Sequence, residues 1–199
     1  MKFTISRDAL LKPLNLVAGV VERRQTLPIL GNLLFSVRGG ILEITGTDLE
    51  IEVKTRVDVD ADADGEFTLP ARKIIDICRA LPEGVSVQIE VQGERAVVRS
   101  EKSRFTLGTL PAADYPAKDG APAEHVLELE ERDFRRLLEK TGFAMAQQDV
   151  RYYLNGLLLE LSEGTMNAVA TDGHRLAMAS LGLSGAATEE LQSIIPRKT

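Results

Sequence analysis

The sequence contains no tryptophan, one cysteine and no apolar run that approaches the about 20 residues needed to span a membrane. The single Cys78 excludes an internal disulfide framework and fits a reducing compartment. It lies in a helical pattern of isoleucines, which favours core packing. The charge pattern of the N-terminus and its Pro13 do not suit a signal peptide. We therefore expect a cytoplasmic protein that does not contact a membrane.

Signatures of catalysis are equally scarce. The two histidines, His125 and His174, are too few for a histidine-rich metal site, and Cys78 has no companion ligand. The sequence has no glycine pattern of a phosphate loop or dinucleotide site, and no nucleophile elbow. We therefore expect no catalytic residue, no metal and no cofactor.

Two motifs keep other functions open. Asp172 and His174 could serve a hydrolase, although the sequence supplies no third catalytic group at recognisable spacing. The run Asp60-x-Asp62-x-Asp64 matches the first half of a calcium loop, but the twelfth position, which needs a bidentate acid, is Ala71.

The charge balance argues at first against nucleic acid. The net charge is −6, whereas affinity for DNA comes largely from phosphates neutralised by Lys and Arg. The charges are segregated, however. All charged residues in the range 58–66 are acidic. The basic residues form local clusters, which are Arg23-Arg24, Arg72-Lys73, the helical group Arg132, Arg135, Arg136 and Lys140, and the pair Arg197-Lys198. An acidic shell around a basic inner face would give the same total.

The strongest internal feature is a repeat. Residues 3–53 align without a gap on residues 127–177. Leu30–Leu34 then falls on Leu154–Leu158, and Thr47-Asp48 on Thr171-Asp172. This period is too long for a solenoid and indicates duplicated domains. Because Asp172 repeats Asp48, which has Glu50 rather than histidine two places on, the Thr-Asp pair is predicted to shape a turn.

Each copy is predicted to begin with a short strand, at 3–5 or 126–129, followed by an amphipathic helix. Ser6 is the expected N-cap of the first helix, and Pro13 disturbs its pattern. In the second helix Phe134, Leu137, Leu138 and Thr141 should line one face, while Arg132, Arg136 and Lys140 line another. Further strands are expected at 32–37, 41–45, 51–59, 66–69, 85–91, 96–100 and 104–110, with a helix at 71–81, and in the second copy at 156–161, 166–170 and 176–181.

The predicted domains are residues 1–122, with a linker from about 111 that is rich in Pro, Ala, Asp and Gly, and residues 123–199. The motif Leu69–Lys73 is echoed by Ile194–Lys198, just before the last residue. We expect the second domain to be truncated, with a sheet edge and apolar strand faces left uncovered.

Two loops at equivalent places in the repeat carry Arg and Gln. One spans 147–153 and ends in Tyr152 and Tyr153, and the other spans 22–26. Both could simply connect helix to strand. Alternatively, they could present amides, guanidinium groups and aromatic faces to a nucleic acid.

Several motifs together resemble the bacterial sliding clamp family, the β subunit of DNA polymerase III, along the whole chain. They are RQTLPILGNLL at 24–34, TGTDLE at 45–50, PARK at 70–73, TLPAADYP at 109–116, QDVRYYLNG at 148–156 and TDGHRL at 171–176. The resemblance implies an α+β fold of duplicated clamp domains, each with helices on one face of curved antiparallel sheets. It also implies a non-catalytic ring around duplex DNA, which keeps the polymerase processive.

The resemblance also assigns site residues. DNA contacts are implied for Arg24, Arg72, Lys73, Gln148, Tyr152, Tyr153, Arg197 and Lys198. A pocket for short peptides is implied for Leu154, Thr171, Gly173, His174, Arg175 and Leu176. A subunit interface is implied for Phe105 and Leu107, with charge contacts from Arg95, Lys102 and Arg104.

The implied partners are duplex DNA, bound without sequence preference, the polymerase III catalytic subunit, the clamp loader, and other replication and repair proteins that carry clamp-binding peptides. The family's full chain has three domains and forms a head-to-tail homodimer. We expect a chain of this length not to close such a ring, and its peptide pocket to be open.

Overall fold

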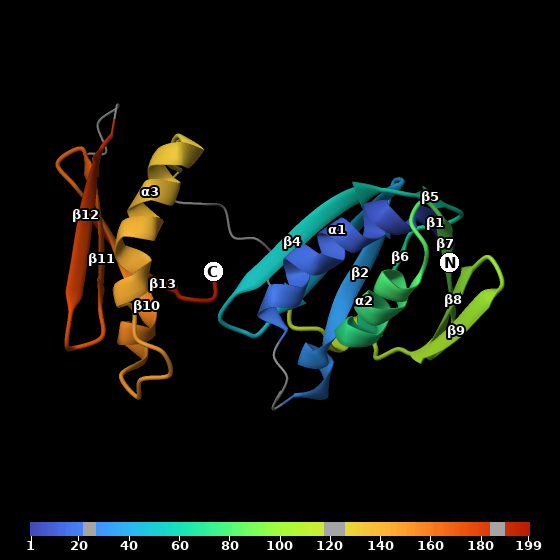
Figure 1. The fold of residues 1–199 in the computed structure, drawn as a ribbon. Helices are drawn as coiled ribbons and strands as arrows, with labels where there is room; N and C mark the ends of the chain where they lie inside the picture. The colour runs from blue at the N-terminus through green and yellow to red at the C-terminus, as the bar shows by residue number, and fades with distance from the viewer. Residues whose placement is uncertain (22–26, 118–125, 184–189) are drawn as a thin grey trace. The chain divides into compact units, whose positions relative to one another are not determined.

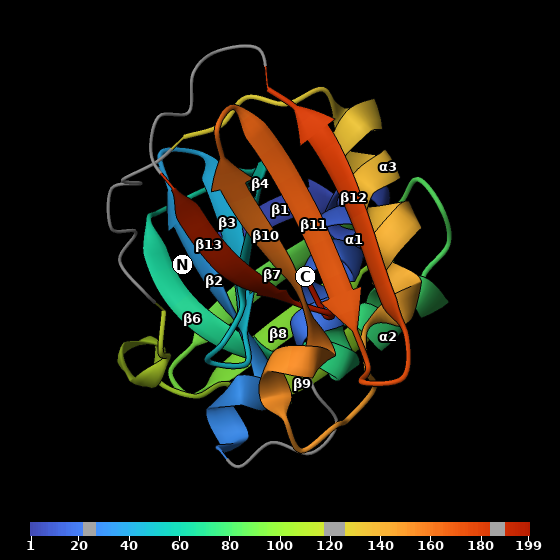
Figure 2. The ribbon, with the colours of Figure 1, turned by 90° about the vertical axis from the view of Figure 1, so that its left-hand side faces the viewer.

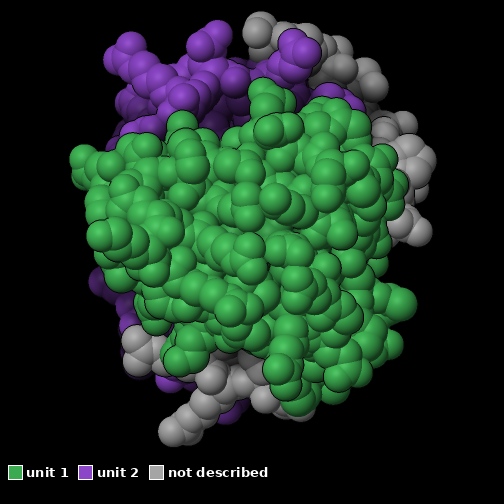
Figure 3. Space-filling view, turned by 90° about the vertical axis from the view of Figure 1, so that its right-hand side faces the viewer, with its two compact units in different colours: residues 1–121 green, residues 122–199 purple. Residues whose placement is uncertain are grey.

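The computed structural model describes residues 1–21, 27–117, 126–183 and 190–199. The chain forms two compact units, Met1–Ala121 and Pro122–Thr199 (Figure 3). Among the residues that the structure describes, no helix is long and apolar enough to span a membrane.

The described residues of unit 1 form two antiparallel sheets and two α-helices (Figure 1). One sheet has the strand order β5-β1-β7-β8-β9 and the other β4-β3-β2-β6. Its elements are β1 (Lys2–Ser6), α1 (Arg7–Val17), β2 (Asn32–Arg38), β3 (Ile41–Thr47), β4 (Glu52–Asp58), β5 (Asp60–Ala61), β6 (Gly65–Pro70), α2 (Ala71–Ala80), β7 (Ser86–Gln92), β8 (Arg95–Ser100) and β9 (Ser103–Gly108), with short 3-10 turns at η1 (Ala18–Val20), η2 (Pro28–Gly31) and η3 (Ala112–Asp114).

Unit 1 is itself built from two similar halves that exchange their first strands. The strand β6 pairs with β2 of the other half, and β1 pairs with β7. Without a tryptophan, three phenylalanines join the two sheets. Phe35 stacks on Phe67 with ring centroids 5.1 Å apart, and Phe67 lies 6.2 Å from Phe3 of the other sheet. Burial of this aromatic cluster stabilises both sheets together.

The first helix forms as its sequence predicts. The Ser6 hydroxyl accepts a hydrogen bond from the Ala9 N–H at 3.2 Å and so caps α1. The apolar stripe of Leu10 and Leu14 is fully buried. The helix continues through Pro13, which lies on the buried side, so the missing N–H costs one hydrogen bond without ending the helix.

Unit 2 repeats the first half of unit 1. It has one sheet of order β12-β11-β10-β13, with α3 packed against β11 and β12 (Figure 2). The strand register repeats as well. Gly156 pairs with Pro196 in unit 2, and the equivalent Asn32 pairs with Pro70 in unit 1. On α3, Leu137 and Thr141 are buried, whereas Leu138 is 37% exposed. The elements are α3 (Glu131–Thr141), η4 (Gly142–Ala144), η5 (Tyr152–Asn155), β10 (Gly156–Ser162), β11 (Thr165–Thr171), β12 (Leu176–Gly182) and β13 (Leu191–Pro196).

The strand predicted at residues 126–129 is wrong, because residues 126–130 carry no regular secondary structure. Its counterpart β1 is a strand because it pairs along its whole length with β7. The described part of unit 2 contains no strand equivalent to β7. Alternating hydrophobicity without a partner strand does not make a sheet, because the backbone groups remain unpaired.

The first half of the predicted linker is packed against unit 1. Tyr115 is 6% exposed, and its hydroxyl donates to the carbonyl oxygen of Thr45 at 3.1 Å. The Leu110 backbone is held by the Thr68 hydroxyl, which accepts from its N–H and donates to its carbonyl. This segment therefore belongs to the first unit as far as its last described residue, Ala117.

Tyr115 should make unit 1 sensitive to alkali. Burial raises the pKa of Tyr115 to about 12, whereas a tyrosine in an unfolded chain ionises near pH 10. The stability that this group contributes is therefore fully present below about pH 10 and is lost as the pH rises through about 12. We expect urea midpoints to fall more steeply over this range for the wild type than for Tyr115→Phe. Equal slopes would contradict the burial of this hydroxyl.

Candidate functional site

The turn between β11 and β12 is closed by its own Thr-Asp pair. The Thr171 hydroxyl donates to the carbonyl of Arg175 at 2.7 Å and accepts from the N–H of Gly173. One Asp172 oxygen accepts from the backbone N–H groups of His174 and Arg175, both at 3.0 Å. These backbone N–H groups, that of Arg175 first, lower the pKa of Asp172. The carboxylate thus contacts the backbone of His174, whereas a catalytic dyad requires contact with the imidazole.

Unit 1 contains the same turn with different side chains. The Thr47 hydroxyl donates to the carbonyl of Ile51, and Asp48 accepts from the N–H groups of Glu50 and Ile51. The third residue is left-handed in both turns, with φ of 80° at Leu49 and 87° at the equivalent glycine. The prediction that the Thr-Asp pair is structural is therefore confirmed by the repeated hydrogen bonds.

The two turns differ in what they expose. Ile51 is 9% exposed, whereas the side chain of its counterpart Arg175 is 58% exposed. The Arg175 guanidinium lies 5.5 Å from the ring centre of Phe143, which is a cation–π distance. His174 replaces Glu50 and is exposed. The turn of unit 2 thus presents an imidazole and a guanidinium where unit 1 presents an acid and a buried isoleucine.

A second loop, residues 145–155, is held beside this turn. The Asn155 side chain accepts from the N–H of Asp149 at 2.9 Å and donates to its carbonyl at 2.8 Å. The Asp149 carboxylate accepts two hydrogen bonds from the Arg151 guanidinium. These bonds, with one from the Arg151 backbone, lower the pKa of Asp149 to about 2. The carboxylate is therefore charged, and it fixes the direction of the arginine.

Arg151 joins the loop to the turn. A methyl group placed on Gly173 would lie 3.2 Å from a guanidinium nitrogen of Arg151, so the Arg151 side chain packs against the backbone of the turn. At the end of β13, Arg197 donates from its side chain to the carbonyl of Met145 and from its backbone to that of Asn155. Leu154, which is 8% exposed, ends the loop. The structure thereby brings Leu154, the 171–176 turn and Arg197 to one end of unit 2.

The same loop presents aromatic rings to solvent. Tyr152 is 83% exposed and Tyr153 49% exposed. Their rings pack edge to face, with centroids 5.9 Å apart. Gln148 is also exposed, and its backbone is left-handed with φ of 58°. The adjacent hydrogen bonds of Asp149 and Asn155 hold this loop in place.

The remaining predicted site residues are distributed over both units. Arg72 and Lys73 are exposed in the first turn of α2, and Lys198 follows β13. Leu176, at the start of β12, is 66% exposed. Arg24 lies outside the described residues. Phe105 and Leu107 are half-buried on β9, the edge strand of its sheet, and Arg95, Lys102 and Arg104 are exposed nearby.

Two carboxylates of the acidic run 58–66 accept hydrogen bonds from backbone N–H groups. Asp62 accepts from the N–H of Lys2 at 2.7 Å, and Asp64 from the N–H of Gly39 at 3.0 Å. Within the described ranges no three His, Cys, Asp or Glu side chains gather into a metal-binding group. The calcium hypothesis therefore gains no support from the geometry.

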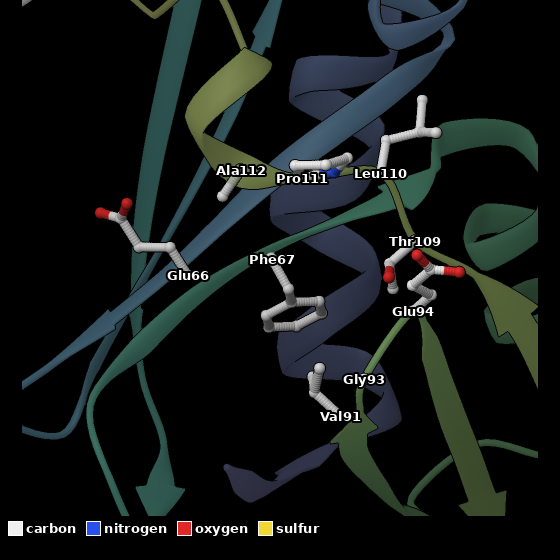
Figure 4. A pocket seen from close by; sticks show the side chains of 9 residues that line it. All are labelled: Glu66, Phe67, Val91, Gly93, Glu94, Thr109, Leu110, Pro111 and Ala112. Carbon is white, nitrogen blue, oxygen red and sulfur yellow. The ribbon is translucent and has the colours of Figure 1, made fainter.

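Sequence reasoning missed a cavity of about 420 Å³ in unit 1 (Figure 4). It lies between β6, the β7–β8 turn and residues 109–112, with the Phe67 ring between Val91 and Ala112. The carboxylate of Glu66 at its rim is engaged by Arg38 and Ser36. These residues are far apart in sequence, so no local pattern predicts the cavity.

Comparison with known proteins gives the family. The family model for the N-terminal domain of the DNA polymerase III beta subunit matches residues 1–119, and that for its central domain matches residues 128–199. The chain belongs to the DNA polymerase III beta subunit family. It is 55% identical to the beta sliding clamp of Pseudomonas aeruginosa and 51% identical to that of Escherichia coli K12, each over all 199 residues of this chain and 54% of the relative.

The fold is similar to solved structures of this family. A crystal structure of the DNA polymerase III subunit beta from Pseudomonas aeruginosa matches with a TM-score of 0.92 at 53% identity, over 100% of this chain and 54% of that chain. A second, of the sliding clamp from the same organism bound to griselimycin, matches with a TM-score of 0.92 at 55% identity and the same coverage. The chain thus spans about half the length of the beta subunits it matches.

Proposed function

We propose that this chain is part of a sliding clamp, which holds the replicative polymerase on duplex DNA and docks partner proteins. The observation that carries this proposal is the match of both units, in order and over the whole chain, to beta sliding clamps. The proposed role is non-catalytic, and its proposed location is the cytoplasm. In a clamp, tethering needs phosphate contacts without sequence information, so affinity should depend strongly on salt.

The distribution of paired and unpaired cations supports DNA binding. In the sheet β4-β3-β2-β6 the cations Arg38, Lys54 and Arg56 all form ion pairs. On α3, by contrast, the only ion pair within the described ranges joins Arg135 to Glu131, and Arg132, Arg136 and Lys140, which are spaced by four residues, form none. This helix thus carries three cations outside ion pairs, whereas the three cations named on that sheet are paired. We assign Arg24, Arg72, Lys73, Gln148, Tyr152, Tyr153, Arg197 and Lys198 as DNA contacts.

Removing both exposed tyrosines should weaken DNA binding without changing its salt dependence. We expect Tyr152→Ala with Tyr153→Ala to lower affinity for a duplex about thirtyfold or more, since aromatic contacts with nucleic acid are worth about 1–3 kcal/mol each and two are lost. The slope of log Kd against log salt should stay constant, because no charge is removed. Fluorescence anisotropy with a labelled duplex measures both quantities. Val150→Ala, at a 97% exposed neighbour in the same loop, is the control and should bind like wild type.

We further propose that Leu154, Thr171, Gly173, His174, Arg175 and Leu176 form one wall of a pocket for short peptides of partner proteins. An apolar floor with a cationic and imidazole rim suits a peptide that has apolar anchors. The proposed partners are the polymerase III catalytic subunit, the clamp loader, and other replication and repair proteins.

Griselimycin, which is bound to the Pseudomonas aeruginosa clamp, tests this pocket. We expect His174→Ala to weaken its binding to this chain about fivefold, which corresponds to a loss of about 1 kcal/mol. The matched control is Glu50→Ala, at the equivalent position of the unit 1 turn, and it should leave binding unchanged. Titration calorimetry, with the Pseudomonas aeruginosa clamp as the reference, measures both. Equal changes of griselimycin affinity in the two variants would contradict a pocket at the turn of unit 2.

We also propose that the edge strand β9 forms a subunit interface of a homodimeric clamp. An edge strand carries unpaired N–H and C=O groups that can pair with another chain. Phe105 and Leu107 would supply the apolar contact. The charge would come from Arg95, Lys102 and Arg104, which form no ion pair with any described residue. The proposal predicts that a charged residue at Phe105 reduces dimer formation in the complete clamp.

A further inference from the structure

A groove lies between α2 and the segment that follows α1, at Ala18 and Val21. The helices α1 and α2 pack side by side (Figure 1). The groove has a volume of about 340 Å³ and a floor of small and apolar side chains, chiefly Ala18, Ala71 and Ile75. Its polar lining comes from three charged side chains of α2, which are Arg72, Asp76 and Arg79.

Arg79 reaches from α2 to α1. Its guanidinium donates to the side-chain oxygen of Asn15 at 2.8 Å, across 64 residues of sequence. A guanidinium has only donors, so the Asn15 amide must turn its oxygen toward Arg79 and its NH2 group away. Asn15 and Arg79 are both exposed, and within the described residues neither side chain forms another hydrogen bond or ion pair. The pair therefore offers several adjacent N–H donors to solvent.

The surroundings of this pair are positive. No ion pair within the described ranges involves Arg72, Lys73 or Arg79, although Asp76 lies between them on the helix. Arg72 and Arg79 are seven residues apart, which places them on one face of α2 at a separation of about 10 Å along its axis. On this face Arg72 and Arg79 stand against Asp76 and leave one net positive charge, and a cluster of N–H donors in such a field suits an anion.

We infer that Asn15 and Arg79 form a seat for one phosphate of the DNA backbone, with Arg79 as the charged contact and Asn15 as both donor and positioning residue. This inference rests on the DNA-binding part of the proposed function, and it adds two residues that the family resemblance did not supply. The seat binds a phosphodiester oxygen and no base, so it carries no sequence preference.

A purely structural role makes a different prediction. Arg79 lies in the last turn of α2, where a cation also stabilises the helix dipole, and its bond to Asn15 joins the two helices. If that were its whole role, substitution would lower the thermal midpoint of unfolding and leave the salt dependence of DNA binding unchanged. A phosphate contact instead contributes about one unit to the salt slope.

The test measures duplex binding by this chain at several salt concentrations, with two unrelated sequences. We expect Arg79→Ala to lower the slope of log Kd against log salt by about one and to weaken both sequences equally. Asn15→Ala removes no charge and should weaken binding severalfold at an unchanged slope. Arg79→Lys should restore most of the slope but less of the affinity, because lysine cannot make the forked contact.

The control is Arg38→Ala, which also removes one positive charge but from an ion pair on the sheet. If Arg38→Ala changes the slope of log Kd against log salt as much as Arg79→Ala does, the loss of net charge alone explains both results. That outcome would overturn the proposed phosphate seat. Saturable binding of inorganic phosphate alone, lost in Arg79→Ala, would reassign the seat to free phosphate. If Tyr152→Ala with Tyr153→Ala weakens binding and Arg79→Ala does not, only this inference fails. If the wild type shows no salt-dependent binding, the DNA-binding proposal fails with it.

Discussion

Thr68→Val is expected to destabilise unit 1 by about 3 kcal/mol, because a fully buried hydroxyl loses three hydrogen bonds. The Thr68 hydroxyl accepts from the Asn32 side-chain amide at 2.9 Å and from the Leu110 N–H at 2.9 Å, and it donates to the Leu110 carbonyl at 2.8 Å. Valine keeps the volume but leaves the buried Asn32 amide without this partner. Hydrogen exchange of the β2 and β6 amides, read by mass spectrometry, measures the stability of unit 1 independently of unit 2.

The matched control is the same substitution at Thr55. Its hydroxyl oxygen is buried without a hydrogen-bond partner among the described residues, and the neighbouring inward residues of β4 are Val53 and Val57. Thr55→Val removes an unsatisfied polar atom, so we expect it to leave stability unchanged or to raise it by up to about 1 kcal/mol. Equal losses at both positions would show that the hydrogen bonds of Thr68 contribute little.

Local sequence signals predicted the parts of the fold whose causes are local. The Ser6 cap and the Leu10 and Leu14 stripe needed only neighbouring residues, and α1 formed as predicted. The Thr-Asp turns were predictable because a side chain bonds its own backbone two to four residues on. The repeat then gave two copies of one pattern, which made the turn a structural feature rather than a catalytic pair.

Features that depend on distant partners escaped prediction. The strand expected at 126–129 had the alternation of β1 but not its partner β7. Tyr115 lies in a stretch of linker composition, yet it is anchored to Thr45, 70 residues away. The bond between Arg79 and Asn15 likewise spans 64 residues. Propensity and periodicity describe a segment by itself, whereas these contacts are decided by what the rest of the chain places against it.

In the candidate site, too, motifs predicted the residues but not the contacts between them. Its residues were assigned from motifs of a family, and the motif positions Leu154, Thr171 and Arg197 do lie at one end of unit 2. What no motif predicted is the connection between them. The Asp149 carboxylate directs Arg151 toward Gly173, so the loop that carries the tyrosines and the turn of the proposed pocket are in contact.

Gly156 and Asn32 show how two copies of one fold diverge. They are equivalent in the repeat, and each pairs with the proline that ends the neighbouring strand. In unit 1 the Asn32 side chain bonds Thr68. In unit 2 a methyl group of Ile194 fills that space, 2.6 Å from where the first side-chain carbon of residue 156 would lie. The hydrogen bond between Asn32 and Thr68 in unit 1 corresponds to the contact between Gly156 and Ile194 in unit 2. Exchanging one residue of a pair without the other would therefore reproduce neither contact.

Gly156→Ala is therefore expected to destabilise unit 2 by about 3 kcal/mol, the upper part of the range for overpacking. The added methyl would lie 2.8 Å from the carbonyl oxygen of Ile195, a backbone atom that cannot move without disturbing the β10–β13 pairing. Because Asn155 holds Asp149, a shift here should also loosen the tyrosine loop and weaken the proposed DNA binding. The control is Gly182→Ala, where nothing lies within 4 Å and the expected effect is small. Hydrogen exchange on β10 and β13 measures both variants, and unchanged protection in Gly156→Ala would refute the close packing of Ile194 on Gly156.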